Sequence, residues 1–586
     1  MKFLNIPDLP EPLASAFRAC RPHFIGIAVF SGLLNVLFLA PSIYMMQVYD
    51  RVVPTGGLTT LFFITLVVAF ALMTLAALDA IRARLLVRVS LRLDRLVSGP
   101  LLEKLMARTA PGAPIQGMRE FDTLRQAISG QAALGFLDAP WTPLYLIIAF
   151  MLHPALGGLT LFGGVVLVIL AIFNERSTKT KAQAAAKATT SAYAAQEAAA
   201  QNAEVVRALG MRGALRERQL ADRRVGLSLS GQAQFTGGQF AAATKFMRLF
   251  LQSAALGLGA WLAVERQISA GAIIAASILM SRALQPVEQV VGSWGTVVSA
   301  RSALKTLSEL FASPESETPR TQLPDPKGHL QFDKAVVRAP GSDQLLLKGV
   351  SFGLKPGEVM GVVGPSGAGK TTLARLAAGA ASPDMGFVRL DGANMADWDP
   401  DRLGRHVGYL PQDSALIAGS IRDNISRFAL WRGDASEGVD AAVVAAAQTA
   451  GVHDVILKLP KGYDTVLTHG GRGLSAGQAQ RVALARALYG DPALVILDEP
   501  NSALDADGEN ALGRAILAAK ARGAAVMIIA HRTGVLQAVD QLLVLRDGAV
   551  EKVGPRAEVL AQMQQPRPAA AAAGGAGNVV ELKGQP

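Results

Sequence analysis

Residues 361–373 read GVVGPSGAGKTTL, and this stretch indicates the fold of the C-terminal half of the chain. It fits the spacing G-x-x-x-x-G-K-[ST], directly after an apolar strand and before a helical segment, which is the context that the pattern requires. The glycines let backbone N–H groups curl around phosphate oxygens, and the start of the following helix adds positive potential. The stretch therefore predicts a phosphate-binding loop made of Gly364, Pro365, Ser366, Gly367, Ala368, Gly369, Lys370, Thr371 and Thr372.

Two side chains of this loop have specific expected tasks at a bound ATP. Lys370 is expected to reach the β- and γ-phosphates, and the hydroxyl of Thr371 is expected to ligate Mg²⁺. Further along, LVILDEP at 494–500 places Asp498 and Glu499 at the end of a buried strand, where α/β sheets bind their ligands. We expect Asp498 to hold Mg²⁺ through water and Glu499 to act as the general base for the attacking water.

Two more polar residues follow expected strands. Gln412, in GYLPQD, lies on a loop and can contact both Mg²⁺ and the water, and His531, in IIAHR, can hydrogen-bond the γ-phosphate. A lone histidine at a strand end is usually structural, and its order after the other motifs is what favours a catalytic role. The expected catalytic set is therefore Glu499, His531 and Gln412, and the expected metal set is Thr371, Gln412 and Asp498.

The composition of the chain predicts a membrane region. The 586 residues are 51% hydrophobic and 18% charged, whereas about 25% are charged in a typical soluble domain. The mean hydropathy is +0.31. Apolar runs near the roughly 20 residues that a bilayer needs predict six spans, with the lipid bilayer as a partner, at 23–40, 58–80, 141–152, 156–173, 245–264 and 268–285.

Basic residues set the expected orientation of these spans. Segments 81–140 and 174–238 carry many arginines and lysines, whereas the loops on the other side contribute Arg51 and Arg266. By the positive-inside rule, both termini and both long loops lie in the cytoplasm. The net charge of +11 reports these loops, so we expect no nucleic-acid partner. The N-terminal residues do not read as a secretory signal peptide, and a single cysteine, Cys20, excludes an intrachain disulfide.

The expected domain plan follows from these runs. The alanine-rich stretch at 177–210 favours helix and is expected to extend the fourth span into the cytoplasm, although a low-complexity linker is the alternative. After a Pro- and Ser-rich linker, β-branched runs alternate with helical segments, which predicts an α/β domain with a largely parallel sheet. The expected parts are an N-terminal cytoplasmic segment, a transmembrane domain with two cytoplasmic extensions, the linker, the nucleotide-binding domain and a low-complexity tail, at 1–22, 23–310, 311–328, 329–563 and 564–586 respectively.

The ordered motifs resemble those of the ATP-binding cassette (ABC) family, namely the phosphate loop, the Gln412 loop, LSAGQ at 474–478, LVILDE, SALD at 502–505 and His531. The family's signature is usually LSGGQ, so Ala476 replaces a glycine here. The resemblance implies that the signature serves the ATP held by the opposite cassette, through Ser475, Ala476, Gly477 and Gln478. Because one chain has one cassette, it also implies a homodimer with two ATPs between the chains and Asp505 at their interface.

Two positions depart from the family's pattern. Ala339 stands where many members stack an aromatic residue on adenine, which puts the adenine contact in doubt. Many exporters carry a glutamate just before the signature, where this chain offers His469 or Arg472. The contact that couples the two domains is therefore expected to differ.

The order of membrane domain and then cassette resembles ABC exporters, whose fold is a six-span α-helical domain fused to an α/β P-loop NTPase. Short coupling helices are then expected near Gly117–Arg125 and Met211–Arg218. Within exporters, the chain from about residue 20 to 560 resembles the type I secretion ATPases, on the stretches PSIYMMQVYDRVVPTGG, FLDAPWTPLYL, GYLPQD, ARALYGDP and LDEPNSALD. Asp50 and Arg51 in the first stretch fit either a feature of this branch or an ordinary interfacial salt bridge.

This branch exports RTX-type proteases, lipases and S-layer proteins that carry an uncleaved C-terminal signal. The resemblance implies an ATPase coupled to transport in the bacterial inner membrane, with its cassette in the cytoplasm. The implied partners are a membrane fusion protein, a TolC-like outer-membrane protein and the secreted substrate. With 22 residues ahead of the first span, no N-terminal peptidase-like domain is expected. The main alternative is a lipid or drug exporter, and six spans argue against a non-transport ABC ATPase.

Overall fold

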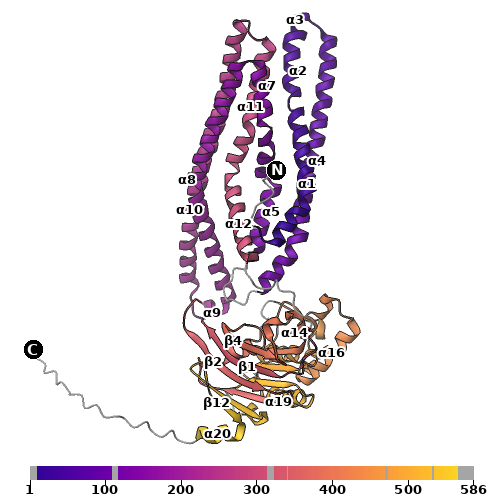
Figure 1. The fold of residues 1–586 in the computed structure, drawn as a ribbon, viewed down its shortest axis with the longest axis vertical. Helices are drawn as coiled ribbons and strands as arrows, with labels where there is room; N and C mark the ends of the chain where they lie inside the picture. The colour runs from indigo at the N-terminus through magenta and orange to yellow at the C-terminus, as the bar shows by residue number, and fades with distance from the viewer. Residues whose placement is uncertain are drawn as a thin grey trace, which may run out of the picture. The chain divides into compact units, whose positions relative to one another are not determined.

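The computed structural model describes residues 9–107, 117–312, 323–339, 341–468, 471, 473–530 and 534–564. The chain divides into two compact units, Met1–Ser316 and Glu317–Pro586. Figure 1 shows that the first unit consists of long helices and the second of sheets covered by helices.

Six helical stretches among the described residues of the first unit are long and apolar enough to cross a membrane. Each of the six spans expected from the sequence overlaps one of them, so this prediction is confirmed. Each stretch contains an apolar window of 18 residues. A helix can cross a bilayer because it satisfies its backbone hydrogen bonds without water. The stretches are Glu11–Thr55, Leu58–Met106, Gln131–Leu152, Pro154–Ala200, Arg212–Val264 and Ala270–Gly292.

The helices of the first unit pack in pairs. In Figure 1, α8 runs beside α10 and α1 runs beside α4, while α7 lies against α11 and α5 against α12. The elements in chain order are α1 (Glu11–Leu37), α2 (Ala40–Gln47), the π-helix η2 (Val48–Val52), α3 (Val53–Thr55), α4 (Leu58–Ala107), α5 (Gly117–Ser129), α6 (Gln131–Asp138), η3 (Ala139–Trp141), α7 (Thr142–Leu152), α8 (Pro154–Gln201), α9 (Ala203–Ala208), α10 (Arg212–Val264), α11 (Ala270–Gly292) and α12 (Trp294–Ala312).

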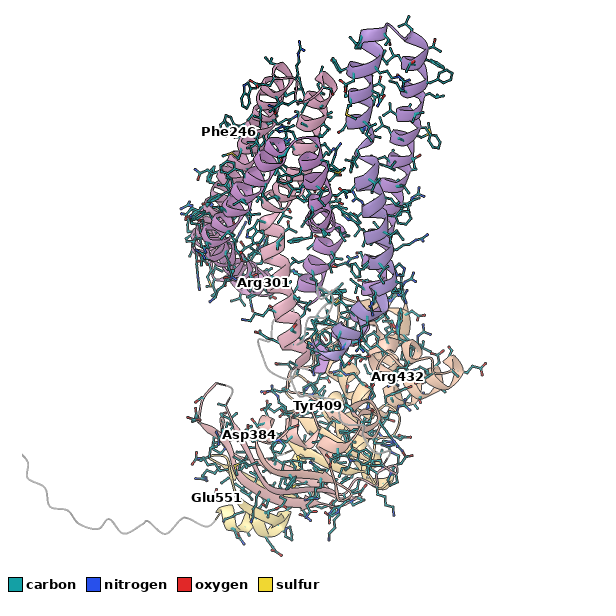
Figure 2. All side chains as sticks on the ribbon, turned by 45° about the horizontal axis from the view of Figure 1, so that its top comes forward. Phe246, Arg301, Asp384, Tyr409, Arg432 and Glu551 are labelled. Atoms are coloured by element: carbon teal, nitrogen blue, oxygen red, sulfur yellow. The ribbon has the colours of Figure 1, made fainter. Side chains whose placement is uncertain are left out.

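Large apolar side chains cover the outer surfaces of these helices. On α4, Phe62 is 65% exposed and Phe70 is 71% exposed, and on α10 Phe246, labelled in Figure 2, is 65% exposed. A soluble protein rarely exposes so large an apolar patch, because burying an apolar side chain away from water is favourable and exposure forgoes that free energy. The outer faces of α4 and α10 are therefore suited to lipid.

The alanine-rich stretch is helical, as expected. It forms the second half of α8, which is continuous over 48 residues and so about 70 Å long at 1.5 Å per residue. A short coupling helix was expected near Met211–Arg218, but residues from Arg212 on form the start of α10, and a separate short helix, α9, precedes them. Its end is fixed by Gly210, which adopts φ +65°, and by hydrogen bonds from Gly210 N to Arg207 O and from Met211 N to Val206 O. This left-handed helix ending forces α10 to begin anew at Arg212, which composition alone does not indicate.

The other short helix, expected near Gly117–Arg125, is α5. It begins at Gly117 and packs against α4 and α12 within the first unit. A methyl group at Gly117 would come 3.0 Å from a Leu105 methyl carbon, so glycine allows the close approach of α5 to α4.

A buried polar network joins three of the membrane-spanning stretches. Nη1 of Arg82, on α4, donates to Oδ1 of Asp138 at 2.9 Å and to the Ser31 hydroxyl of α1 at 3.0 Å. Asn35 Nδ2 donates to the same carboxylate, and the Tyr145 hydroxyl of α7 donates to Asn35 Oδ1 at 2.9 Å. The Arg82 side chain is 7% exposed and that of Asp138 is 14% exposed. A buried ion pair with this many hydrogen bonds fixes how the three stretches pack.

Asp50 contacts the start of α11 rather than pairing with Arg51. Its carboxylate accepts from the Ser269 hydroxyl at 2.5 Å and from Gly271 N at 2.6 Å. A methyl group at Gly271 would lie 2.6 Å from Met46 O, so the two segments are in close contact. A carboxylate at a helix N-terminus is favourable because the first backbone N–H groups have no partner within the helix. Among the described residues, Asp50 therefore anchors the first span to the sixth.

The second unit is built on a mixed sheet of six strands in the order β12-β11-β3-β10-β9-β6. All neighbours are parallel except β12, which pairs antiparallel with β11 at the edge. This confirms the expected α/β fold with a largely parallel sheet. Its strands are β3 (Val359–Val363), β6 (Val407–Leu410), β9 (Leu494–Asp498), β10 (Ala525–Ile529), β11 (Gln541–Arg546) and β12 (Ala549–Pro555).

A four-stranded antiparallel sheet, in the order β2-β1-β4-β5, accompanies it, together with the small pair β7-β8. Their strands are β1 (Leu330–Arg338), β2 (Leu345–Leu354), β4 (Met385–Leu390), β5 (Ala393–Asn394), β7 (Gly419–Ser420) and β8 (Val466–Leu467). Phe332 and Val350 of this sheet share one core with Met360 and Met527 of the six-stranded sheet. The parallel strands are therefore buried on both faces, which explains their continuous apolar sequences.

Helices cover the other face of the six-stranded sheet through a second core. The helices of this unit are α13 (Lys370–Ala377), α14 (Pro400–His406), α15 (Ile421–Ile425), α16 (Ser436–Thr449), α17 (His453–Leu457), α18 (Ala476–Leu488), α19 (Ala506–Ala521) and α20 (Arg556–Gln564), with short 3₁₀ helices at Met395–Asp397, Ala429–Arg432, Gly462–Asp464 and Val535–Ala538.

Candidate nucleotide site

The parallel strands bring the expected site residues to one edge of the sheet. The phosphate loop follows β3, Asp498 ends β9, and Gln412 follows β6. Because β3, β10, β9 and β6 are neighbours in this order, the carboxyl ends of the four strands lie side by side. Ligands of α/β sheets bind at this edge.

Glycines let the phosphate loop turn back against the sheet. A methyl group at Gly364 would clash with the backbone carbonyl of Leu545 in β11. Gly369 adopts φ +96°, and a methyl group there would lie 2.8 Å from Leu346 O. Gly369 also caps α13, which begins at Lys370. Larger residues at these two positions would push the loop away from its strand, so the backbone itself requires glycine.

Lys370 lies over the loop that precedes it. Its Nζ donates to Gly364 O at 2.9 Å and to Pro365 O at 3.0 Å, and the residue is 7% exposed. Burial lowers the pKa of Lys370, while the nearby carboxylates of Glu499 and Asp498 oppose that shift. The ammonium group is therefore held over the phosphate loop by two backbone carbonyls.

Asp498 is fully buried at the end of β9. Burial raises the pKa of its carboxyl, and Glu499 adds to that shift; the Thr371 hydroxyl opposes it, as do Arg375 and Lys370. Neither carboxylate oxygen of Asp498 accepts a well-formed hydrogen bond from the residues that the structure describes. The Thr371 hydroxyl nevertheless lies close enough to favour the charged form of the carboxyl. A buried carboxylate with unsatisfied oxygens beside a threonine hydroxyl suits a hard divalent cation that prefers oxygen ligands.

Glu499 and Gln412 meet across the ends of β9 and β6. Nε2 of Gln412 donates to Oε2 of Glu499 at 3.3 Å. Glu499 has φ +50°, and its backbone N–H donates to Ile529 O of β10 at 3.0 Å. A non-glycine residue in this left-handed conformation is strained, and such strain often occurs where a side chain must be aimed at a ligand.

The Gln412 loop is anchored from behind by two arginines. Nη1 of Arg486, on α18, donates to Ala415 O at 2.9 Å, and the Arg427 guanidinium donates to carbonyls of Val407, Arg486 and Ala487. Burial, together with Arg486 and Arg432, lowers the pKa of Arg427 to about 10. These contacts tie β6, which carries Tyr409 (Figure 2), to the helix that follows the signature.

The signature residues form the start of α18. The Ser475 hydroxyl accepts from Gln478 N at 3.3 Å, and Gln478 Oε1 accepts from Ser475 N at 2.9 Å, which is a reciprocal capping box. Ser475 and Ala476 are exposed, while a methyl group at Gly477 would lie 2.8 Å from Ala503 O. The cap leaves the hydroxyl proton of Ser475 free to donate, and the Gln478 side chain is used within the helix start.

Two contacts of α18 were not found from the sequence. Buried Gln480 donates to Glu499 O at 3.2 Å and accepts from Ala503 N at 2.9 Å. Arg481 pairs with Asp505 at 3.1 Å, and Asp505 also caps α19 by accepting from Gly508 N. These contacts link the signature helix to Glu499 and to SALD. In the sequence they appear only as a glutamine and an arginine shortly after the signature, and this pair matches no known motif.

Some expected site residues lie outside the described residues, namely His531, His469 and Arg472. Ala339 directly follows β1, is half-buried, and its N–H donates to Gln344 O at 2.8 Å. The structure therefore brings together the phosphate loop, Asp498, Glu499 and Gln412, and it places Ser475 at the separate start of α18.

Comparison with known proteins agrees with this arrangement. The ABC transporter family matches residues 347–502, and the ABC transporter transmembrane region matches residues 24–287. The type I secretion system ATP-binding protein PrsD of Rhizobium meliloti (strain 1021) is 41% identical over 562 residues, which is 94% of this chain and 95% of that protein. The chain belongs to the ABC transporters of type I secretion.

Two further relatives extend the comparison. The toxin RTX-I translocation ATP-binding protein of Actinobacillus pleuropneumoniae is 29% identical over 92% of this chain and 77% of its own length. A bacterial Atm1-family ABC exporter with ATP bound has a TM-score of 0.82 at 22% identity, over 93% of this chain and 96% of that one. The latter likeness shows the exporter fold. As a member of its family, this transporter is an ATPase coupled to transport.

Proposed function

We propose that this transporter is the ATP-driven inner-membrane exporter of a type I secretion system and moves a protein with an uncleaved C-terminal signal out of the cell. The observation that carries the proposal is identity of 41% with a type I secretion protein across both the membrane half and the cassette. A match confined to the cassette would not separate protein export from lipid export, because both use the same ATP chemistry.

The ATP site is proposed to use the residues gathered at the sheet edge. Backbone N–H groups of residues 364–372 and the Lys370 ammonium bind the phosphates. The buried oxygens of Asp498, the Thr371 hydroxyl and Gln412 fit Mg²⁺, which when bound neutralises charge on the phosphates. Glu499, aimed by its strained backbone and by Gln412, accepts the proton of the attacking water. His531 is proposed to contact the γ-phosphate.

The working form is proposed to be a homodimer. Ser475 is exposed at the start of α18, and its hydroxyl retains a proton to donate. A helix N-terminus of this kind binds phosphate oxygens, so Ser475, Ala476 and Gly477 of one copy would complete the site formed by Lys370 of the other. Gln478 and Asp505 are proposed to support that surface, since each already fixes a helix start.

Orientation and partners follow the same proposal. The cassette is proposed to lie in the cytoplasm, an orientation that the basic loops favour. Closure of the cassette pair on ATP is transmitted to the membrane helices, and hydrolysis reopens the pair. A membrane fusion protein and a TolC-like outer-membrane protein would complete the path across the envelope.

The test compares cells with and without the gene. The proteins of the medium and cell surface are identified alongside the extracted lipids. Loss of one abundant secreted protein, restored by the gene on a plasmid, supports the proposal and names the substrate. An unchanged set of proteins together with an altered lipid profile overturns it in favour of a lipid exporter.

A further inference from the structure

A cavity of about 880 Å³ lies between α10 and α11. Its charged and polar lining comes from one face of each helix, because the residues are spaced three or four apart. On α10 these are Lys245, Arg248 and Gln252, and on α11 they are Ser281, Arg282, Gln285, Glu288 and Gln289.

The charges of this cavity do not cancel. Arg248 pairs with Glu288 through Nε and donates to the Ser281 hydroxyl at 2.9 Å. The guanidinium of Arg282 lies over the Phe38 ring, 3.9 Å from its centroid, and donates to Gln285 Oε1 at 3.1 Å. No carboxylate pairs with Lys245 or Arg282 among the described residues. Three cations and one anion therefore leave the cavity positive.

With the connection between α10 and α11 taken as the bilayer surface, these groups lie within the depth of a bilayer. Arg248 precedes the end of α10 at Val264 by 16 residues, or about 24 Å at 1.5 Å per residue. Arg282 follows the start of α11 at Ala270 by 12 residues, or about 18 Å. Both depths fall inside a hydrocarbon core of about 30 Å. Cations there are costly, so they are expected only where they face a polar path or a ligand.

The neutral lining favours a polypeptide over a lipid as the ligand. Gln252, Gln285 and Gln289 all line the cavity, and Oε1 of Gln289 is buried without a hydrogen-bond partner among the described residues. A carboxamide can donate to a peptide carbonyl and accept from a peptide N–H at the same time. The phosphate of an anionic lipid has no N–H for the buried acceptor.

We infer that this cavity binds an extended polypeptide segment that carries carboxylates, and that Glu288 is a built-in carboxylate which a substrate carboxylate displaces from Arg248. Lys245 and Arg282 attract the segment, and the glutamines contact its backbone. This inference rests on the proposed function as a protein exporter and adds which residues select the substrate.

The test measures binding of two labelled peptides of equal length to the full-length transporter in lipid nanodiscs. One peptide carries aspartates among glycines and serines, and the other has asparagine at the same places. The variants are Lys245→Gln with Arg282→Gln, and Glu288→Gln alone. The matched control is Arg218→Gln with Arg224→Gln, which removes two exposed cations of α10 outside the cavity. Size-exclusion profiles monitor folding, and if the double variant aggregates, Lys245→Gln at an exposed side chain carries the comparison.

We expect the aspartate peptide to bind the wild type at least about tenfold more tightly than the asparagine peptide, since partly desolvated charge pairs have couplings of that order. The cavity double variant should lose this preference and the control should keep it. Glu288→Gln should increase the affinity, a gain that a purely structural ion pair would not produce.

Equal binding of the two peptides to the wild type, or loss of affinity in Glu288→Gln, would overturn the inference. So would a double variant that loses binding of labelled phosphatidylglycerol while its peptide preference persists, because the cavity would then be a lipid site. The assay does not depend on secretion. A secreted substrate identified by gene deletion, together with equal peptide binding, would remove the cavity assignment and leave the proposed function intact.

Discussion

Gln412 Nε2 and Glu499 Oε2 lie 3.3 Å apart, at the ends of two neighbouring parallel strands. The contact keeps the glutamate carboxylate at the edge of the sheet from which the phosphate loop starts. It is the geometric basis for proposing Glu499 as general base.

Glu499→Gln should bind ATP but hydrolyse it at least about 100-fold more slowly, because general-base catalysis contributes about 10²–10⁴ in rate. The measurement is phosphate release by the purified transporter, beside binding of labelled ATP. Glu437→Gln, an exposed acid in α16, is the control and should behave as the wild type. Normal turnover in Glu499→Gln would remove this residue as the base.

Asp498→Asn should stabilise the nucleotide-free transporter at neutral pH while abolishing hydrolysis. Burial raises the pKa of Asp498 above its ordinary value of 3.8, so the charged form is disfavoured in the folded protein. That cost is absent below the unfolded pKa, where the carboxyl is neutral in both states, and it is complete once the pH exceeds the folded pKa. The rise in Tm over wild type should therefore be larger at pH 8 than at pH 5.

A shift of a few degrees is expected for Asp498→Asn, since about 1 kcal/mol moves the Tm of a domain of this size by roughly 2–4 °C. Asp397→Asn, at an exposed position, should leave the Tm unchanged. A lower Tm for Asp498→Asn at both pH values would mean that the charge stabilises the fold.

Arg82→Ala should destabilise the membrane unit by about 3–5 kcal/mol, because it leaves the Asp138 carboxylate buried without its partner. The measurement is thermal unfolding in detergent. Arg84→Ala removes an exposed arginine of the same helix and should have little effect. Replacing both partners, as Arg82→Met with Asp138→Leu, should cost less than Arg82→Ala alone, and equal losses in the two would argue against a buried ion pair.

Cysteines at Ser366 and Ser475 should cross-link two chains when ATP is present. Both positions are exposed, and the chain's single cysteine, Cys20, can be replaced by alanine to give a clean background. In Glu499→Gln, ATP should increase the dimeric band on a denaturing gel. A chain with cysteines at Ser366 and Ser436 should not respond, because Ser436 is exposed at the start of α16 and is not part of the signature. Monomer alone under all conditions would exclude the proposed sandwich.

The phosphate loop, the acidic strand end and the six spans could be predicted because their signals are local. A fixed spacing of glycines and lysine, or a run of apolar residues, imposes its structure without reference to distant parts of the chain.

Contacts between distant segments could not be predicted in this way. Asp50 meets Gly271 across 221 positions and Arg82 meets Asp138 across 56, and nothing in the spacing of either pair indicates its partner. The end of α9 depends on one left-handed glycine, Gly210, within a strongly helical composition, which is why the break before Arg212 was not expected.

ATP hydrolysis by this chain is proposed to drive export of a protein. To test this, the proteins in the medium are identified for cells whose gene carries Lys370→Ala, beside cells that carry the exposed control Lys355→Ala. One abundant secreted protein should disappear from the medium with Lys370→Ala and remain with Lys355→Ala. An identical set of secreted proteins in both strains would contradict it.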